Sequence, residues 1–518
     1  MTTQKKIIFF TIILVAVLLR LVNLNGLPYG VNQDEADRVY EAYSLLKTGH
    51  DQHGNRWPLT LEAFGKERDN ASAISAYAAM PFVALLGPSP LAGRLPSAIA
   101  GILTVVAVIY IAFKLSQSWK VACVTGFVLA VSPWHLTFSR YGHEAIWATA
   151  LFCIGLAAFL RALDNKPAYF FLTSIAWVTG LYGYPVSKLF IPAMIVILAV
   201  VFWRRILQHR HWLIWAVAMG ILLLIPLAFW QIQNFTDAGR FNEISVFGEP
   251  NWFWNLFLNF GSYLNPFEWL LGHLTAGPLD WLMVFFGIPL FFMTAKKFHI
   301  PKPVQWLLGL WLGFSILPSI LTDFNPSQTR AILLLGPLQI VGAWGLVNFF
   351  KIFAIERKRL FVLPLAVSGC LACAAMGLFI FWQPAYFINK TFAWVNPTFL
   401  PEIGRVVKVL EEKYPNASEI RVVDDNLNQP QIFFMLFKPW DPAKVQSEHI
   451  FETNSKGWYR TTRLGRYVFC RYSECKTQNP GIIYVEVATA QPLGNRLLEK
   501  IPIKILDRYN LAWIISAD

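Results

Sequence analysis

Long apolar runs separated by short basic clusters constrain the fold of this chain more than any other feature. The runs begin near Ile7, Leu95, Val121, Ala145, Ala168, Leu189, Trp212, Trp281, Val304, Ala331 and Phe361. Each run has about the 20 residues that an α-helix needs to cross a bilayer. Only 14% of the residues are charged, whereas soluble domains have about 25%. The sequence therefore predicts an α-helical polytopic membrane protein with about eleven transmembrane helices.

The basic residues indicate how the predicted helices cross the membrane. They gather between alternate runs, for example at Lys5 and Lys6 and at Arg204 and Arg205. The positive-inside rule places such clusters in the cytoplasm. We therefore expect a multi-pass protein of the cell membrane, plasma or inner, with a cytoplasmic N-terminus. Because topology accounts for the net charge of +13, no nucleic-acid partner is expected.

The first outer loop, residues 25–94, is far longer than a connection between two helices needs. Its apolar pattern predicts helices at Asp34–Leu46 and Ala71–Leu86. The second of these ends in a run of about a dozen apolar residues from Ser75, which is too short for a span. We therefore expect interfacial helices along the membrane surface, within a transmembrane domain of residues 1–382.

Residues 383–518 have a different composition, with strand-like runs separated by turns, as at Ile420–Val423 and Tyr467–Tyr472. This pattern predicts a soluble extracytoplasmic domain of the α/β or α+β class. Cys470 and Cys475 lie in this segment, separated by four residues. They could form a disulfide in an oxidising compartment or remain two free thiols, but they lack the further ligands of a zinc site.

Asp34 and Glu35 are the first candidates for catalysis, because they follow the first apolar run directly. Ionised carboxylates are strongly hydrated, so a pair at the membrane surface must face water, a cation or a group whose proton they can accept. One interpretation is that both simply offset the positive end of a helix dipole. The functional interpretation is a general base, alone or with a metal, at the boundary of water and membrane.

The short second outer turn supplies a further polar cluster of Arg140, His143 and Glu144. Arg140 and Glu144 could simply pair with each other at the membrane surface. Alternatively, Glu144 could add a carboxylate beside Asp34 and bind a cation or orient an acceptor hydroxyl. This cluster is therefore a candidate for contacting the acceptor or a metal.

Cationic and aromatic residues at two other span ends are candidates for holding a phosphate. Tyr182, Tyr184 and Lys188 lie between two apolar runs, and Arg330 opens a later one. Tyr and Lys at a helix end can also be ordinary contacts with lipid headgroups. A guanidinium at the membrane surface suits a phosphate, which it can bind by two hydrogen bonds. Lys188 and Arg330 together therefore form a candidate clamp for a lipid phosphate.

The order of these features resembles polytopic glycosyltransferases of the C superfamily, of the type of protein O-mannosyltransferases and lipid A aminoarabinose transferases (glycosyltransferase family 39). The resemblance covers roughly the first 350 residues. It rests on Asp34-Glu35 after the first span, Arg94–Ser97, the Ser139–Glu144 turn, the Tyr182–Phe190 stretch, and Asn325-Pro326 before Arg330. The lipid A branch usually has Arg-Pro-Asp where this chain has Arg140-Tyr141-Gly142, so the resemblance implies no particular sugar.

The resemblance implies a sugar transfer from a polyprenyl-phosphate donor at the outer face of the membrane. Asp34 would be the catalytic base, supported by Glu35, and Glu144 would take the place of the acidic residue in the second outer loop. The acceptor would be a lipid, a glycan or a protein, and membrane lipids would surround the site. No cofactor is required for this inverting displacement, although a divalent metal is possible.

A polytopic transporter or a flippase for lipid-linked sugars is the alternative of a different class. Such a protein usually needs polar groups near the middle of the membrane and two related halves. The sequence shows no internal repeat and few charges inside the apolar runs. A scaffold that recruits partners through its C-terminal domain is a third possibility.

Overall fold

The structure is a computed structural model of the full chain. It describes residues 2–62, 64–65, 70–233, 245–270, 276–323, 326–356, 399–400, 402–425, 427–448, 450–453, 458–475, 482–488, 494, 496–502 and 512–517. The chain divides into two compact units. The helical unit comprises Met1–Val22, Ser97–Ser139 and Glu144–Phe381. The α/β unit comprises Asn23–Pro96, Arg140–His143 and Trp382–Asp518.

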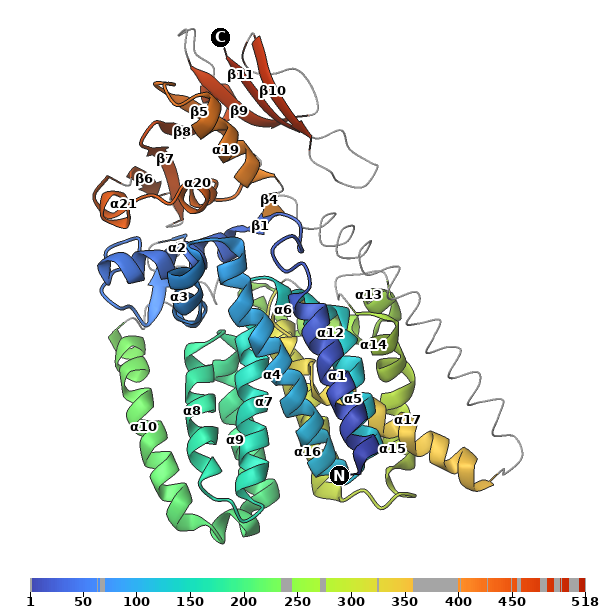
Figure 1. Ribbon diagram of the computed structural model, residues 1–518. Coiled ribbons are helices and arrows are strands. Elements are labelled where there is room, and N and C mark those ends of the chain that lie inside the picture. Colours follow the sequence, from blue (N-terminus) through green and yellow to red (C-terminus); the bar gives the residue numbers. More distant parts are fainter. Residues whose placement is uncertain are drawn as a thin grey trace. The chain divides into compact units, whose positions relative to one another are not determined.

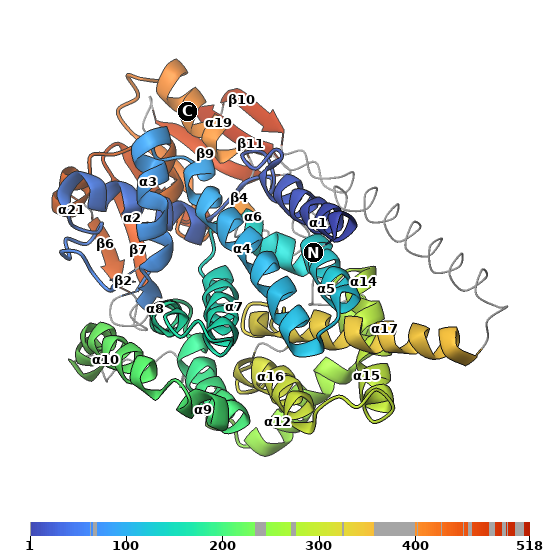
Figure 2. The ribbon, with the colours of Figure 1, turned by 60° about the horizontal axis from the view of Figure 1, so that its bottom comes forward.

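Apolar helices make up the helical unit (Figures 1 and 2). They are α1 (Thr3–Leu21), α4 (Pro90–Ser116), α5 (Trp119–Val131), α6 (Pro133–Arg140), α7 (Ala145–Ala162), α8 (Tyr169–Tyr182), α9 (Val186–Leu207), α10 (Arg210–Gln233), η2 (Val246–Gly248), α12 (Trp252–Leu264), α13 (Pro266–Leu270), α14 (Pro278–Leu282), η3 (Met283–Gly287), α15 (Ile288–Ala295), α16 (Lys302–Ile320), η4 (Ile332–Leu334) and α17 (Pro337–Glu356). The start of α4, up to Pro96, belongs to the α/β unit.

Length and composition make six of these helices able to cross a membrane within the described ranges, or seven if α5 and α6, bent by 55°, form one span. The chain is therefore a multi-pass membrane protein. Every predicted span up to the one near Ala331 coincides with a helix or helix pair. The span predicted from Phe361 lies outside the described residues, so the total of about eleven stays a prediction.

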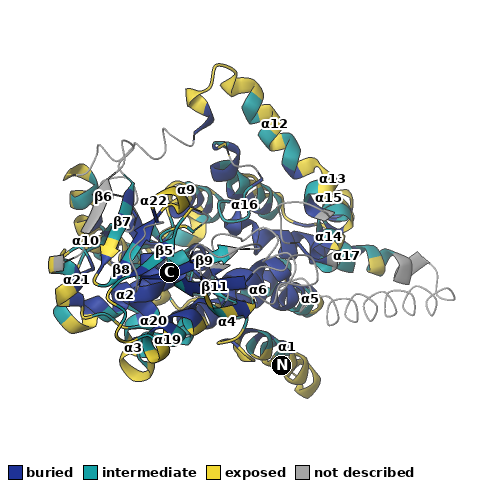
Figure 3. Cartoon of the chain, turned by 90° about the horizontal axis from the view of Figure 1, so that it is seen from above, coloured by how far each residue is buried: buried dark blue, intermediate teal, exposed yellow. Residues whose placement is uncertain are grey.

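Close contacts between helices hold the helical unit together. Helix α8 packs against α7, α9 and α10, and α17 packs against α5 and α15. A Cβ on Gly155 would lie 2.3 Å from the Trp177 ring, and a Cβ on Gly345 would lie 1.9 Å from the Gly287 carbonyl. Small residues therefore permit this approach, as is common between membrane helices. Figure 3 shows exposed residues along α1, and exposed apolar side chains such as Ile221 on α10 suit a lipid environment.

A mixed sheet forms the centre of the α/β unit. The elements of the unit are β1 (Val31–Asn32), α2 (Gln33–Thr48), β2 (Thr60–Glu62), β3 (Asn70–Ser72), α3 (Ile74–Leu86), β4 (Phe399–Leu400), α19 (Ile403–Lys413), β5 (Ile420–Val423), α20 (Gln431–Phe437), α21 (Pro442–Glu448), β6 (Ile450–Thr453), β7 (Tyr459–Leu464), β8 (Tyr467–Cys470), α22 (Tyr472–Cys475), β9 (Ile483–Ala488), β10 (Arg496–Pro502) and β11 (Ala512–Ala517). The seven strands lie in the order β10-β11-β9-β5-β8-β7-β6. Strand β5 is parallel to both β8 and β9, and the other pairs are antiparallel. The predicted class, a helical membrane protein with a C-terminal α/β or α+β domain, is confirmed.

The first outer loop and the C-terminal segment share one hydrophobic core. Helix α2 packs against α3, α20 and α21 (Figure 1), and strand β1 pairs antiparallel with β4. The hydroxyl of Tyr40 on α2 donates a hydrogen bond to the Trp440 carbonyl over 3.1 Å. Figure 3 shows α2 as largely buried. Asn23–Pro96 therefore clusters with the C-terminal segment, while the predicted domain boundary at 382 lies outside the described residues and stays a prediction.

Helix α2 and the segment that follows it bring buried carboxylates together. Asp37 and Glu41 on α2 and Asp51 in that segment are fully buried. The Gln52 side chain donates to Asp37 over 2.8 Å, and the Gln52 backbone N–H donates to Glu41 over 3.0 Å. Burial, with the nearby Asp37 and Asp51 as further causes, raises the pKa of Glu41 well above its usual range. Asp37 also contacts Arg38.

Several local expectations agree with the structure. The predicted helix at Asp34–Leu46 is α2, and the predicted strand at Ile420–Val423 is β5 with the same bounds. Cys470 and Cys475 form a disulfide, which resolves the alternative left open by the sequence. The apolar run before Gly87 forms α3, a helix of 13 residues. Its expected position at the membrane surface stays a prediction.

Candidate active site

The start of α2 positions the Asp34–Glu35 pair. Asn32 is the N-cap residue, and its side-chain oxygen accepts a hydrogen bond from the Asp34 N–H over 2.8 Å. In return, the Glu35 carboxylate accepts from the Asn32 N–H over 3.4 Å. This capping box satisfies amide groups that the first turn of a helix leaves without partners. Both carboxylates therefore lie in the first turn, where the helix dipole favours negative charge.

Glu35 is fully buried and bound to Arg94, which lies near the start of α4. Arg94 Nε donates to Glu35 Oε1 over 2.6 Å and Arg94 Nη2 donates to Glu35 Oε2 over 3.1 Å. The same guanidinium donates to the carbonyls of Leu24, Asn25, Pro28 and Gly30 over 2.7–3.1 Å. Arg94 thereby fixes the segment before α2, and a paired charge at such depth is far less costly than an isolated one.

Asp34 differs from Glu35 because its side chain is one-third exposed. Its Oδ2 lies 4.0 Å from Nε2 of His143, whose side chain is 15% exposed. A Cβ on Gly142 would lie 3.3 Å from Glu35 Cγ, so the second outer turn packs directly on the start of α2. The structure thus brings together Asp34, Glu35 and His143, which are separated by more than 100 positions in the sequence.

Arg140, at the start of the second outer turn, also binds the segment before α2. Its Nη2 donates to the carbonyls of Asn23 and Leu27 over 3.1 and 3.2 Å. Arg140 is 5% exposed. Two arginines therefore hold the chain between the first span and α2. Glu144 follows His143 in sequence and is the half-exposed N-cap residue of α7 in the helical unit.

Tyr182 has a structural partner within the helical unit. Its hydroxyl donates to the Leu223 carbonyl over 2.7 Å and accepts from the Leu227 N–H over 3.1 Å. Those two groups would bond to each other in a regular helix, but Pro226 lies between them in α10. The Tyr182 hydroxyl therefore completes the backbone bonding at this point of α10. Lys188, exposed in the first turn of α9, donates to the Gln231 side chain over 3.1 Å.

Arg330 lies close to Tyr184, so two of the predicted phosphate-binding residues come together. Burial lowers the pKa of Arg330, while the nearby Tyr184, Asp323 and Tyr263 oppose that shift. The Arg330 backbone N–H donates to the Ser327 hydroxyl over 3.3 Å, which orients the turn before η4. The helical unit therefore has a half-buried cation near two tyrosines and one carboxylate.

The described residues offer a poor site for a metal at the acid pair. Both Glu35 oxygens accept hydrogen bonds from Arg94, so only Asp34 could supply a free carboxylate there. More widely, no group of three or more His, Cys, Asp or Glu among the described residues could hold a metal ion. The need for a cofactor is therefore not established.

Sequence reasoning gives no role to three groups of buried polar residues. Arg94 enters the sequence analysis only as part of a motif, but an arginine near the start of an apolar run is itself a signal, because a buried charge requires partners. In the helical unit, Arg20 Nη2 lies 2.6 Å from His135 Nδ1. Asp280 accepts hydrogen bonds from Ser132 over 2.8 Å and from Gln339 over 3.1 Å. These last contacts join helices, so their partners could not be read from the sequence.

Comparisons with solved structures show which known proteins share this fold. ArnT from Cupriavidus metallidurans bound to undecaprenyl phosphate is 12% identical with a TM-score of 0.58, over 99% of this chain and 98% of that chain. The archaeal oligosaccharyltransferase AglB from Archaeoglobus fulgidus, in complex with an inhibitory peptide and a dolichol-phosphate, is 13% identical with a TM-score of 0.54, over 84% of this chain. The chain spans 63% of the AglB length. The oligosaccharyltransferase of the same archaeon in complex with Zn and sulfate is 14% identical with a TM-score of 0.53, over 83% of this chain and 61% of that chain.

The chain therefore has the fold of ArnT and of the archaeal oligosaccharyltransferase, which agrees with the resemblance found in the sequence. In addition, residues 72–230 match the family described as dolichyl-phosphate-mannose-protein mannosyltransferase. No curated protein sequence matches the chain.

Proposed function

We propose that this protein transfers a sugar from a polyprenyl-phosphate donor to a hydroxyl or amine of a lipid, glycan or protein acceptor. The observation that carries the proposal is the division of roles within the acid pair. Glu35 is fully buried and bound to Arg94, whereas Asp34 is one-third exposed beside His143. An accessible carboxylate on a rigid helix start is suited to accept a proton, because its neighbours fix its position.

The reaction is a single displacement with inversion at the anomeric carbon. Asp34 accepts the proton of the acceptor hydroxyl while the acceptor oxygen forms a bond to the anomeric carbon. The bond between that carbon and the phosphate oxygen breaks, and its electron pair leaves with the polyprenyl phosphate. Because a phosphate leaving group needs little protonation, cations that stabilise its charge are sufficient and no separate general acid is required.

Arg330 and Lys188, with Tyr184, are the residues proposed to stabilise the leaving phosphate. Arg330 and Tyr184 are neighbours in the structure, and Lys188 is exposed at the start of α9. Tyr182 bonds to α10 and is proposed to position this region rather than to contact the donor. The undecaprenyl phosphate bound to ArnT and the dolichol-phosphate bound to AglB support a lipid phosphate as the donor carrier.

The acceptor is proposed to meet the protein at the second outer turn. His143 lies beside Asp34 and could orient an acceptor hydroxyl, while Arg140 holds the turn in place. Glu144 follows directly in sequence and could contact the acceptor or a cation. One structure of the archaeal relative contains zinc, but the bonds of Glu35 to Arg94 give no support for a shared metal at the acid pair, and no step is assigned to one.

The proposed location is the plasma or inner membrane, with a cytoplasmic N-terminus and an extracytoplasmic C-terminal domain. The basic clusters between alternate apolar runs support this orientation. Both the first outer loop and the C-terminal segment belong to the α/β unit, which agrees with their lying on the same side of the membrane.

The substitution Asp34→Asn tests the proposal, with transfer of radiolabelled sugar from a panel of undecaprenyl-phosphate hexoses and pentoses as the assay. Loss of a general base lowers the rate by about 10²- to 10⁴-fold. The partly exposed site should tolerate the amide, so thermal unfolding should stay at the wild-type temperature. Glu412→Gln, a surface substitution of the same type in α19, is the matched control and should leave transfer unchanged. Wild-type transfer by Asp34→Asn would remove Asp34 from the mechanism, whereas wild-type protein inactive with every donor would favour the transporter or flippase alternative.

A further inference from the structure

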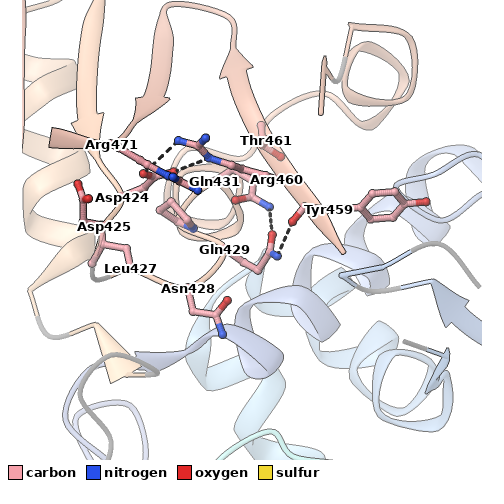
Figure 4. A pocket seen from close by; sticks show the side chains of 11 residues that line it. Asp424, Asp425, Leu427, Asn428, Gln429, Gln431, Tyr459, Arg460, Thr461 and Arg471 are labelled. Atoms are coloured by element: carbon pink, nitrogen blue, oxygen red, sulfur yellow. Dashed lines mark hydrogen bonds and ion pairs between the residues drawn. The ribbon is translucent and has the colours of Figure 1, made fainter. Parts of the chain in front are cut away.

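A polar cavity of about 460 Å³ lies in the C-terminal part of the α/β unit (Figure 4). Asp424 and Asp425 follow strand β5, and Arg471 follows strand β8. Arg460, near the start of β7, forms another wall. The volume of the cavity falls in the range of about 300–1,000 Å³ that is typical of small-molecule sites.

Sheet topology explains why these side chains meet. Strands β5 and β8 are parallel neighbours, with Val423 opposite Cys470. The residues that follow them, Asp424 and Arg471, therefore leave the sheet at the same edge. Ligand sites in open sheets with parallel strands form at this carboxyl edge, because the connecting loops diverge there. The disulfide between Cys470 and Cys475 closes the loop that carries Arg471 and so restrains that wall.

The charged side chains that line the cavity balance, while Arg460 also lies 3.4 Å from Glu474 outside the lining. Arg460 binds Asp424 through two contacts of 3.2 and 3.4 Å, and Asp425 accepts a hydrogen bond from the Tyr472 N–H. Two acidic and two basic side chains line the cavity, namely Asp424 and Asp425 with Arg460 and Arg471. A site for a phosphate or a metal ion would carry an excess of one sign. The balance therefore favours a neutral ligand.

Carboxamide side chains add both donors and acceptors to the wall. Gln429 Nε2 donates to the Tyr459 carbonyl over 2.9 Å, and Gln431 Nε2 donates to Gln429 Oε1 over 2.7 Å. Asn428 is exposed at the rim. Each carboxamide has two N–H groups and two acceptor lone pairs, so these bonds leave further capacity for a ligand. Planar amides, carboxylates and guanidiniums together match the closely spaced hydroxyl groups of a sugar.

Tyr459 connects this cavity to the first outer loop. Its carbonyl lies on the cavity wall, while Figure 4 shows its ring directed away from the cavity. That ring stacks on His53 with centroids 5.3 Å apart, and the Tyr459 N–H donates to the Phe64 carbonyl over 2.8 Å. The cavity therefore belongs to the same compact unit as Asp34.

We propose that the cavity at the carboxyl edge of β5 and β8 binds a neutral sugar residue of the acceptor. The assignment to the acceptor rests on the proposed function, whereas the sugar chemistry rests on the lining residues alone. A bound sugar would receive hydrogen bonds from Arg471 and the carboxamides and would donate its hydroxyl protons to Asp425. Such a contact would hold a glycan acceptor on the α/β unit that also carries the base.

Direct binding tests the sugar chemistry without relying on catalysis. The full-length protein in detergent is mixed with mannose, galactose or N-acetylglucosamine at millimolar concentrations, and saturation transfer from protein to sugar is measured by NMR. Asn428→Ala and Arg471→Ala should abolish the signal, because both side chains are exposed at the cavity and their loss leaves the fold intact. The matched controls Asn416→Ala and Arg405→Ala alter exposed residues of the same unit outside the cavity and should bind as wild type. Absence of binding by the wild-type protein, or equal binding by the cavity variants, would overturn the proposal.

Transfer kinetics then distinguish an acceptor sugar from a donor sugar. Loss of a hydrogen bond to a charged group should raise the acceptor KM by about tenfold for Arg471→Ala. The donor KM and kcat at saturating acceptor should stay at wild-type values. A rise confined to the donor KM would refute the acceptor assignment, as would unchanged KM values for both substrates. Asp34→Asn should still bind the free sugars, so failure of the proposed base and failure of the sugar site give different results.

Discussion

The bond between Glu35 and Arg94 leads to a quantitative prediction about stability. Glu35→Gln keeps the size of the side chain and its acceptor for the Asn32 N–H, but it removes the charge that faces Arg94. Both side chains are fully buried. Removing one partner of a buried ion pair costs about 3–5 kcal/mol, because the remaining charge is left without compensation. We expect Glu35→Gln to lower the free energy of unfolding of the α/β unit by this amount.

The remaining contacts of Arg94 predict how a series of variants should rank by their loss of stability. After Glu35→Gln, Arg94 still has four carbonyl acceptors within 3.1 Å. Arg94→Gln should be more destabilising than Glu35→Gln, because it leaves a buried carboxylate and also removes these donors. Asp34→Asn should be close to neutral, since Asp34 is partly exposed. Glu35→Asp serves as a further control, because it keeps the charge but shortens the reach to Arg94.

Thermal unfolding in lipid nanodiscs, followed by tryptophan fluorescence, measures this order. Sugar transfer should be measured at a temperature where each variant remains folded, so that stability and catalysis are separated. An unfolding temperature for Glu35→Gln equal to that of Asp34→Asn would refute the reasoning. It would mean that the buried pair contributes nothing beyond what neutral side chains can supply.

Two further variants test groups described above. Burial raises the pKa of Glu41 in the folded protein well above its usual 4.5. As pH rises above 4.5, Glu41 in the unfolded state loses its proton while Glu41 in the folded state keeps it. The stability of the wild-type protein therefore falls with rising pH until the pKa of the folded state is passed. Glu41→Gln lacks this loss, so its thermal stability relative to wild type should increase as pH rises above 4.5; a difference that is constant with pH would contradict this. Arg330→Ala should raise the KM for an undecaprenyl-phosphate sugar by about tenfold or more, because a charged hydrogen-bond donor to phosphate is lost, and an unchanged donor KM would remove Arg330 from the phosphate site.

Local chemistry explains which parts of the fold could be predicted. The start of α2 was predictable because Asn32 and Glu35 have the spacing of a capping box, which depends on neighbouring residues only. Strand β5 was predictable for a similar reason, since a short β-branched run precedes Asp424 and Asp425. Apolar length alone indicated the helices of the helical unit.

Contacts between distant segments could not be predicted in the same way. Arg94 binds Glu35 across 59 positions and Tyr182 binds α10 across more than 40, and nothing in the local pattern specifies those partners. Tyr182 is a candidate for the donor phosphate because it lies at a span end with Tyr184 and Lys188. Its position beside Pro226 depends on how α8 packs against α10, which only the structure shows.

The cavity beside β5 was missed for a different reason. In the sequence, Asp424 and Asp425 mark the end of a strand, which is how acidic residues in a turn are usually interpreted. Their significance depends on β5 and β8 being parallel neighbours, and that pairing joins residues almost 50 positions apart.

The short ladder between β1 and β4 has a consequence for how such proteins can be recombined. Val31 pairs with Leu400 and Asn32 pairs with Phe399, so the residue that caps α2 is held by the C-terminal segment. Exchanging the C-terminal segment alone with that of a relative would divide a shared core. It would also remove the strand partner of Asn32, the N-cap residue of the helix that carries Asp34. A functional chimera would have to inherit the first outer loop and the C-terminal segment together, as one heritable module.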